Sequence, residues 1–228
     1  MYPLGMATTP PQASDPDWER DRELLERWRE GDNKAGQELF DRHGEAVIRF
    51  FHNKVGVDAQ DLIQDTFLRL VATRERITAG VAFRAYLLGI ARFVLLEHLR
   101  KLGKARARGV DASVDSIAVL LPGPSTIAAR KLEQRLLIEG LRHLPLDQQI
   151  LLELYYWEGL KGREIAEVLN IPASTVRGRL ARAREQLREA VRKHGSTQAL
   201  VASTLDGLDD WAQSVRAKLG PDPESETQ

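Results

Sequence analysis

The stretch REIAEVLNIPASTVRGRLARAREQLRE (residues 163–189) contains two helical patterns separated by a break. The first pattern ends at Asn170, a residue type that tolerates the left-handed conformation found at the ends of many helices. The next helix is predicted to begin at Ala173 or Ser174, and Ser174 is a suitable capping residue. Two helices joined by a turn of this kind form a helix-turn-helix, an arrangement that binds DNA in many proteins.

The second of these helices has an apolar side and a basic side. At about 100° per residue, four apolar residues fall within about 60° of one another: Val176, Leu180, Ala183 and Leu187. The other side combines small residues with arginines, which lets a helix lie deep in a major groove while guanidinium groups reach guanines or phosphates. Arg179 and Arg184 are predicted to point sideways, toward the sugar–phosphate strands. The predicted DNA contacts are Ser174, Thr175, Arg177, Gly178, Arg179 and Arg182.

Charge is balanced over the whole chain but not along it. The chain carries 33 Lys and Arg against 33 Asp and Glu, a formal net charge of zero. Residues 92–108 hold six bases and one acid, and 177–193 hold seven bases and two acids, a net of +5 in each stretch. The ends are acidic: 1–30 hold seven acids and four bases, and 195–228 hold six acids and two bases. Two basic stretches suggest two contacts with a polyanion, although two solvated helix ends would give the same counts.

Composition excludes several functional classes. Cysteine is absent from the 228 residues, which excludes a disulfide scaffold, a thiolate zinc site and a cysteine nucleophile. No phosphate-binding or dinucleotide-binding glycine pattern occurs, and the five histidines never form a His-Glu-x-x-His pair. The densest apolar stretch, 85–96, is interrupted by Arg92 and falls short of the ~20 residues of a membrane span. We therefore expect a soluble, cytoplasmic protein without enzymatic activity, metal or cofactor.

Helical periodicity occupies two parts of the chain, and no stretch shows the two-residue alternation of a strand. The predicted fold is all-α, with two small helical bundles joined by a flexible linker. A disordered tail, 1–16, would precede the first bundle, 17–102; a linker rich in Gly, Ala, Ser and Pro, 103–125, would lead to the second, 126–194. Residues 195–228 would form an extension with one amphipathic helix and an acidic tail. Packing of that helix on its own bundle is favoured over binding of a partner.

Residues 163–189 resemble the region-four helix-turn-helix of bacterial RNA polymerase sigma factors, in the extracytoplasmic-function (ECF) group of the sigma-70 family. The overlapping stretch LRHLPLDQQILLELYYWEGLKGREIA (residues 141–166) is similar to the rest of that region. The resemblance implies that the helix-turn-helix reads the minus-thirty-five element of a promoter.

The first bundle carries a separate resemblance. DLIQDTFLRL (residues 61–70) resembles the region-two helix that holds the polymerase clamp. Its polar side suits docking on a basic protein surface, because complementary charge sets register and encounter rate. The predicted polymerase contacts are Asp61, Gln64, Asp65 and Arg69. The core side is predicted to contain Ile63, Phe67, Leu70 and Val71, with Leu62 at its edge.

FRAYLLGIARFVLLEHLRK (residues 83–101) resembles the next helix, which melts and reads the minus-ten element. Its core side is predicted to contain Phe83, Leu87, Ile90, Ala91, Val94 and Leu95. The preceding loop, 74–81, would by resemblance hold a flipped-out base. Binding of single-stranded DNA needs a basic track next to pockets or stacking surfaces for unstacked bases. The predicted minus-ten contacts are Thr78, Ala79, Gly80, Arg92, Arg100 and Lys101.

Four positions depart from the family pattern. Tyr86 stands where tryptophan is usual, Phe93 where asparagine is usual, Glu97 at a common aspartate position and Gly178 at a common serine position. The first two bear on promoter melting. A glycine inside a helix costs about 1 kcal/mol relative to alanine, so close approach of the backbone to DNA is one reason for Gly178.

Together the resemblances imply an alternative sigma factor, which binds core RNA polymerase and directs promoter-specific transcription initiation. The resemblances imply two further partners: promoter DNA, both duplex and melted, and an anti-sigma factor. The residues alone leave two other classes open. One is a dimeric helix-turn-helix regulator that binds DNA without polymerase, and the other is an adaptor that keeps the bundles but has lost DNA reading.

Overall fold

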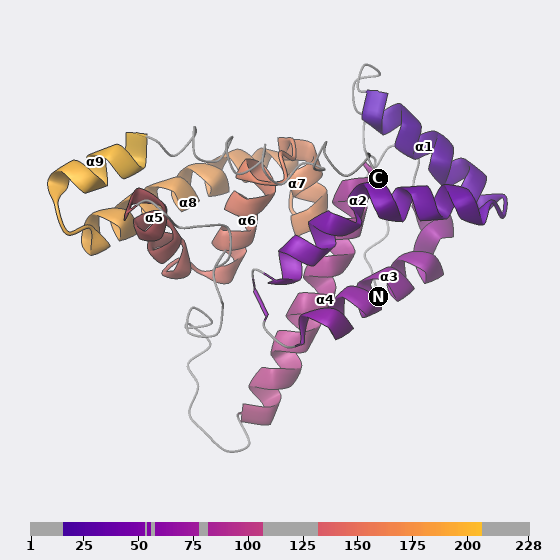
Figure 1. Cartoon of the computed structure of the whole chain (residues 1–228), viewed down its shortest axis with the longest axis horizontal. Coiled ribbons are helices and arrows are strands. Elements are labelled where there is room, and N and C mark those ends of the chain that lie inside the picture. The colour runs from indigo at the N-terminus through magenta and orange to yellow at the C-terminus, as the bar shows by residue number, and fades with distance from the viewer. Residues whose placement is uncertain (1–15, 53, 56–57, 78–81, 107–131, 207–228) are drawn as a thin grey trace, which may run out of the picture. The chain divides into compact units, whose positions relative to one another are not determined.

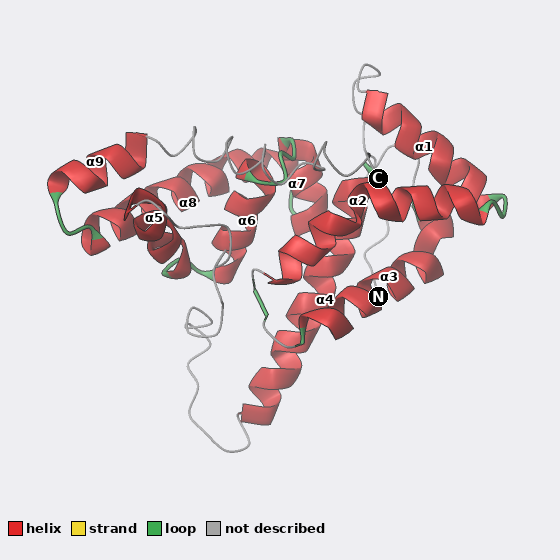
Figure 2. Cartoon of the chain, in the orientation of Figure 1, coloured by secondary structure: helices red, strands yellow, loops and turns green. Residues whose placement is uncertain are grey.

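A computed structural model of the chain describes residues 16–52, 54–55, 58–77, 82–106 and 132–206. Within these residues all regular structure is helical, which confirms the predicted all-α class (Figure 2). None of the helices among them is long and apolar enough to cross a lipid bilayer.

The described helices belong to two compact units (Figure 1). The first unit contains α1 (Pro16–Arg29), α2 (Asn33–His52), α3 (Ala59–Thr73), the short 3-10 turn η1 (Arg74–Arg76) and most of α4 (Phe83–Arg106). The second contains α5 (Leu132–Arg142), α6 (Leu146–Tyr156), α7 (Gly162–Leu169), α8 (Ala173–His194) and α9 (Gln198–Asp206). Helix α4 continues four residues into the stretch predicted as linker, whose remainder lies outside the described residues.

Helix α4 supplies a large part of the core of the first unit. All six of its predicted core residues are buried, each at most 3% exposed: Phe83, Leu87, Ile90, Ala91, Val94 and Leu95. The other helices of the unit also supply fully buried residues, among them Leu24 of α1, Leu39 and Phe50 of α2 and Leu70 of α3. The core of the first unit is therefore shared by all four of its α-helices.

The predicted core stripe of α3 is only partly correct. The helix buries Leu62, Thr66 and Leu70, at i, i+4 spacing, while Val71 is 40% exposed. Thr66 can be buried because its hydroxyl donates a hydrogen bond to the Leu62 carbonyl at 2.8 Å, which satisfies its polar group inside the helix. Phe67 is half-buried and meets the Phe40 ring edge-on at 5.2 Å. The core side is thus rotated toward Leu62.

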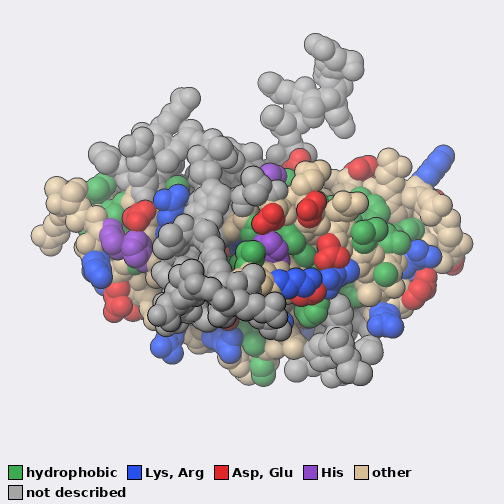
Figure 3. All heavy atoms as spheres, turned by 90° about the horizontal axis from the view of Figure 1, so that it is seen from below, with side chains coloured by type: hydrophobic (Ala, Val, Ile, Leu, Met, Phe, Trp, Pro, Cys, Tyr) green, Lys and Arg blue, Asp and Glu red, His purple; other side chains and the backbone are tan. Residues whose placement is uncertain are grey.

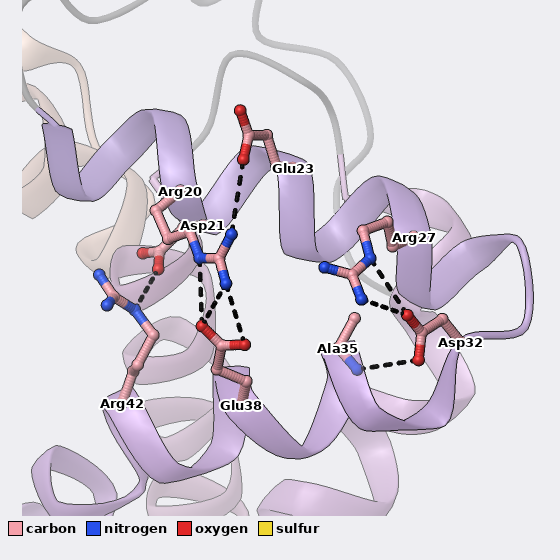
Figure 4. Close-up of polar contacts among 8 residues, drawn as sticks. All are labelled: Arg20, Asp21, Glu23, Arg27, Asp32, Ala35, Glu38 and Arg42. Carbon is pink, nitrogen blue, oxygen red and sulfur yellow. Dashed lines mark hydrogen bonds and ion pairs between the residues drawn. The ribbon is translucent and has the colours of Figure 1, made fainter.

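Helices α1 and α2 form a hairpin held by ion pairs and by a cap (Figure 4). Arg20 pairs with Glu38 at 2.9 Å, and Arg42 pairs with the 7%-exposed Asp21 at 3.0 Å. At the turn, Asp32 accepts a hydrogen bond from the backbone of Ala35 and pairs with Arg27 at 2.6 Å. The hydrogen bond from Arg27, followed by that from Ala35, lowers the pKa of Asp32. These contacts fix the start of α2 against α1.

The second unit is assembled around α8, which contacts all four of the other helices. Its predicted core residues Val176, Leu180, Ala183 and Leu187 are all buried, as is Val191. Helix α9 packs on α5 and α8, within its own unit. An added Cβ at Gly195 would lie 2.2 Å from Val201, so glycine permits this close approach of α9. The rest of the extension, from residue 207, lies outside the described residues.

The α1–α2 hairpin generates a test of packing with a built-in control. A Cβ added at Gly36 would lie 2.5 Å from Nε1 of Trp28, a rigid ring that is only 4% exposed. Gly36→Ala should therefore lower the free energy of unfolding by about 1–3 kcal/mol through overpacking.

Gly44→Ala, in the same helix, is the matched control. Its new methyl would meet only Phe67 Cζ, at 3.6 Å, an ordinary contact. Its gain in helix propensity should raise the free energy of unfolding by up to about 1 kcal/mol. Denaturant unfolding followed by circular dichroism measures both variants. Equal effects of the two alanines would contradict the close packing of α1 on α2.

Candidate nucleic-acid and polymerase interfaces

The turn between α7 and α8 has the geometry that the sequence predicts. Asn170 adopts a left-handed conformation, with φ of 53°, and ends α7. The backbone N–H of Ile171 donates to the Ala166 carbonyl at 3.0 Å, which satisfies one of the last carbonyls of α7. This turn fixes the direction in which α8 leaves α7.

The predicted cap of α8 is wrong. The helix begins at Ala173 with Pro172 in the capping position, and the N–H of Thr175 donates to the Pro172 carbonyl at 2.9 Å. Ser174 is therefore the second residue of the helix, and it is exposed. Its hydroxyl is left available on the surface where DNA contact is predicted.

The N-terminal half of α8 presents an exposed basic surface. Ser174, Arg177, Gly178, Arg179 and Arg182 are exposed, and Thr175 is half-buried. The three arginines have no ion pair or hydrogen bond with any residue that the structure describes. A Cβ added at Gly178 would meet no atom within 4 Å, so the packing of the chain itself does not require glycine there.

Other arginines of α8 are already engaged. Arg184 lies over the rings of Tyr155 and Tyr156 in α6, at 4.9 and 5.4 Å from their centroids, so the prediction that it points toward a DNA strand is wrong. The aromatic faces attract the guanidinium and hold α8 against α6. Further along, Glu185 pairs with both Arg188 and Arg192 at 3.3 Å. Uncommitted positive charge is thus concentrated in the first half of α8.

Helix α7 adds two features that were not predicted from the sequence. Arg163, near its start, is exposed and has no partner among the described residues, which makes it a candidate phosphate contact. Burial, followed by the charge of Glu164, raises the pKa of Glu167 to about 7. Near neutral pH α7 therefore carries less negative charge than its sequence suggests. Glu167 is half-buried, and the local sequence pattern does not reveal that burial. The raised pKa could therefore not be predicted from the sequence.

In the first unit, the exposed side of α3 is a mixed stripe. Asp61, Gln64, Leu68 and Val71, at spacings of three, four and three residues, are all exposed. Leu68 is 62% exposed and Val71 40%. Leu68 and Val71, three residues apart on one face of the helix, form an exposed apolar patch, and such patches are candidate sites for protein binding. We refer to these four residues as the α3 stripe.

Asp65 and Arg69, also predicted to contact polymerase, are occupied within the unit. Arg69 pairs with Asp65 and with Glu97 of α4, both at 2.9 Å. The same guanidinium lies 5.4 Å from the ring centroid of Phe93, which gives this departure from the family pattern a packing role. Arg69 therefore joins α3 to α4.

The predicted minus-ten contacts on α4 differ in exposure. Arg100 and Lys101 are exposed, whereas Arg92 is half-buried. Lys101 pairs with Glu97 at 2.9 Å, and hydrogen bonds from Lys101 and then Arg69 lower the pKa of Glu97. Thr78, Ala79 and Gly80 lie outside the described residues. On the face shown in Figure 3, acidic and basic side chains are interspersed. The number of basic residues therefore overstates the positive charge that is left to contact DNA.

The described part of the chain contains no candidate metal centre. No group of three or more His, Asp or Glu side chains there could hold a metal ion.

Comparison with known proteins identifies both units. The family model for Sigma-70 region 2 matches residues 39–105, and that for Sigma-70, region 4, matches residues 134–187. The chain is 31% identical over 167 residues to the RNA polymerase sigma factor CarQ of Myxococcus xanthus, covering 72% of this chain and 94% of that one. It is 30% identical over 164 residues to the ECF RNA polymerase sigma factor SigE of Mycolicibacterium smegmatis, covering 71% of this chain and 63% of that one.

Solved structures share the fold. CnrH, in complex with the cytosolic domain of CnrY, has a TM-score of 0.55 at 22% identity and covers 77% of this chain and 99% of its own. The sigma factor RpoE of Bartonella quintana, in complex with the anti-sigma factor NepR, has a TM-score of 0.53 at 23% identity and covers 70% of this chain and 98% of its own. With both regions matched in order and a sigma factor aligned over nearly its whole length, the chain belongs to the ECF group of the sigma-70 family, the non-catalytic RNA polymerase subunits that direct transcription initiation.

Proposed function

We propose that this sigma factor divides promoter recognition between its two units, with α8 reading the minus-thirty-five element and α4 contacting the opened minus-ten element. The observation that carries the proposal is the exposed half of α8, where three unpaired arginines surround a glycine while the opposite side is buried. Its work would take place in the cytoplasm, where core polymerase and promoters meet.

The minus-thirty-five contacts would come from the α8 surface. Arg177 and Arg182 offer planar forks that can donate two hydrogen bonds to a guanine edge, and Arg179 is free to pair with phosphate. Ser174, near the start of the helix, adds a hydroxyl that can donate or accept. Gly178 lets the helix axis come closer to the bases than a larger residue would. The exposed Arg163 would add a phosphate contact from α7.

Core polymerase would dock on the α3 stripe. Asp61 and Gln64 would supply polar contacts, and Leu68 and Val71 would lose their exposed apolar surface to the polymerase, which favours association. Asp65 and Arg69 would act indirectly, because their ion pairs fix α3 on α4. The minus-ten strand would contact Arg100 and Lys101 of α4, together with residues 78–80, which the resemblance assigns to the same strand.

An anti-sigma factor is a further inferred partner. Both solved neighbours were obtained in complex with another protein, and for RpoE that protein is named as an anti-sigma factor. Control by such a partner suits recognition divided between two weakly binding units, because separating the units removes their joint affinity.

The function is tested by run-off transcription on genomic promoter fragments with purified core polymerase, with and without the full chain. New discrete transcripts that require the chain are expected, and their start sites locate both promoter elements. Absence of such transcripts, together with a shift of duplex DNA by the chain alone, would favour the dimeric regulator.

Reading of the minus-thirty-five element is tested on promoters located in this way. Arg177→Ala and Arg182→Ala should each weaken promoter binding by the holoenzyme by about 1–3 kcal/mol, because each removes a guanine or phosphate contact. Arg188→Ala is the matched control in the same helix, since Arg188 is already paired with Glu185. It should change binding by less than about 0.5 kcal/mol. Equal losses in all three variants would show that α8 contributes only bulk charge.

Docking on polymerase is tested at Leu68. Leu68→Ser should raise the dissociation constant for core polymerase about tenfold, since a buried leucine contributes about 1.5–3 kcal/mol relative to an exposed one. Because Leu68 is 62% exposed in the free chain, the thermal unfolding midpoint should hardly change. Ile48→Ser, at an apolar residue of α2 that is 42% exposed, is the control. Unchanged polymerase affinity in Leu68→Ser would exclude the α3 stripe as the docking surface.

A further inference from the structure

The last residue of α1 is bound to a turn that lies far away in the sequence. Arg29 donates from Nε to the main-chain carbonyl of Arg74 at 3.2 Å, and from Nη2 to the main-chain carbonyl of Ile77. Arg29 lies before residue 39, where the match to the region-two family model begins. The contact therefore comes from a part of the chain to which that model assigns nothing.

Both acceptors belong to the end of α3 and the turn that follows it. Arg74 is the C-cap residue of α3, so its carbonyl has no partner further along that helix. Ile77 is the C-cap residue of η1, donates its own N–H back to the Arg74 carbonyl at 3.3 Å and is 1% exposed. The turn is thus fixed from three sides: by its own hydrogen bond, by the buried Ile77 side chain and by Arg29.

The neighbouring residue strengthens the same contact. Trp28, 4% exposed, has the guanidinium of Arg74 at 5.7 Å from its ring centroid. Trp28 and Arg29 together hold the side chain and the main chain of one turn. A planar guanidinium can donate to two carbonyls in a fixed geometry, whereas a lysine ammonium is a flexible point charge. The arrangement is therefore specific to arginine.

Helix α1 also braces the start of α4. Asp21 of α1 accepts from His43 at 2.7 Å, and the His43 ring lies 5.4 Å from the ring of Phe83, the first residue of α4. Ile77 and Phe83, on either side of the undescribed residues, are therefore both linked to α1, Ile77 directly by Arg29 and Phe83 through His43 of α2.

We propose that Arg29 is a positioning residue for minus-ten recognition. It touches no DNA itself, and instead fixes the Arg74–Ile77 turn, and with it the exposed Arg76, relative to α4. The inference rests on the proposed role of the first unit in reading the minus-ten element. Small displacements of a binding element cost large factors in recognition, so releasing this turn should loosen base discrimination before it affects anything else.

The test uses the full chain assembled with core polymerase and a promoter located by run-off transcription. Binding is compared between templates that are pre-opened over the minus-ten region and carry either the natural or a substituted minus-ten sequence. Arg29→Gln should reduce the ratio of the affinity for the natural template to the affinity for the substituted template roughly tenfold. Assembly with polymerase and binding to minus-thirty-five duplex should stay within about twofold of the unsubstituted chain, because α3 and α8 keep their surfaces.

Two further variants separate positioning from charge and from stability. Arg29→Lys keeps the charge but cannot hold both carbonyls, so it should lose discrimination as Arg29→Gln does; rescue by lysine would overturn the proposal. Arg27→Gln is the control on the same helix, because Arg27 pairs only with the nearby Asp32 among the contacts described. It should discriminate normally. If Arg29→Gln is poorly folded at the assay temperature, the discrimination measured for Arg29→Lys tests the proposal by itself.

The outcomes distinguish this inference from the function on which it rests. If the unsubstituted chain assembles with polymerase but shows no preference for the natural minus-ten sequence, the proposed role of the first unit fails. If that preference is present and survives in both Arg29 variants, the role stands and the positioning by Arg29 is wrong.

Discussion

One helix of the second unit has to satisfy two opposing demands. Helix α8 buries Val176, Leu180 and Ala183 against its neighbours, and the hydrophobic effect makes that side the reason the unit holds together. The same 3.6-residue period leaves the opposite side in water, where the arginines lie. Cation–π contacts from Arg184 to α6 then fix the rotation of the helix about its axis. The exposed surface is therefore as well determined as the core.

In the first unit, ion pairs perform the comparable task of aligning helices. Arg69 reaches both Asp65 on its own helix and Glu97 on α4, with the Phe93 ring beside it. A guanidinium with two carboxylate partners constrains α3 relative to α4 more tightly than a single surface pair, which alone contributes little. The helix proposed to bind polymerase and the helix proposed to contact DNA thus share one rigid connection. Phe93, which departs from the family pattern, completes that connection.

The sequence predicts features that depend on local period and local conformation, and it fails where partners are distant. Asn170 and the buried side of α8 were predictable because a left-handed turn and a 3.6-residue stripe are local properties. The core side of α3 was misplaced because two apolar stripes compete there and Thr66 satisfies its own hydroxyl. The engagements of Arg184 with α6 and of Arg69 with Glu97 join residues from separate helices, so no local pattern reveals them. Two of the four residues of the α3 stripe, Asp61 and Gln64, were predicted from their polarity. Leu68 was missed because only its exposure, which the sequence does not show, distinguishes it from the core leucines.

Pairing of charges also explains why such a protein would depend on its polymerase. Of the arginines on α8, Arg184, Arg188 and Arg192 are engaged, and only Arg177, Arg179 and Arg182 have no partner among the described residues. With Arg163 of α7 included, these arginines could neutralise about four phosphates, which gives a shallow salt dependence and weak binding to duplex DNA, since affinity rises with the number of counterions released. A regulator acting alone would need a second copy or a broader basic surface. A unit held on the same promoter as a second recognition unit gains the missing affinity from effective concentration instead.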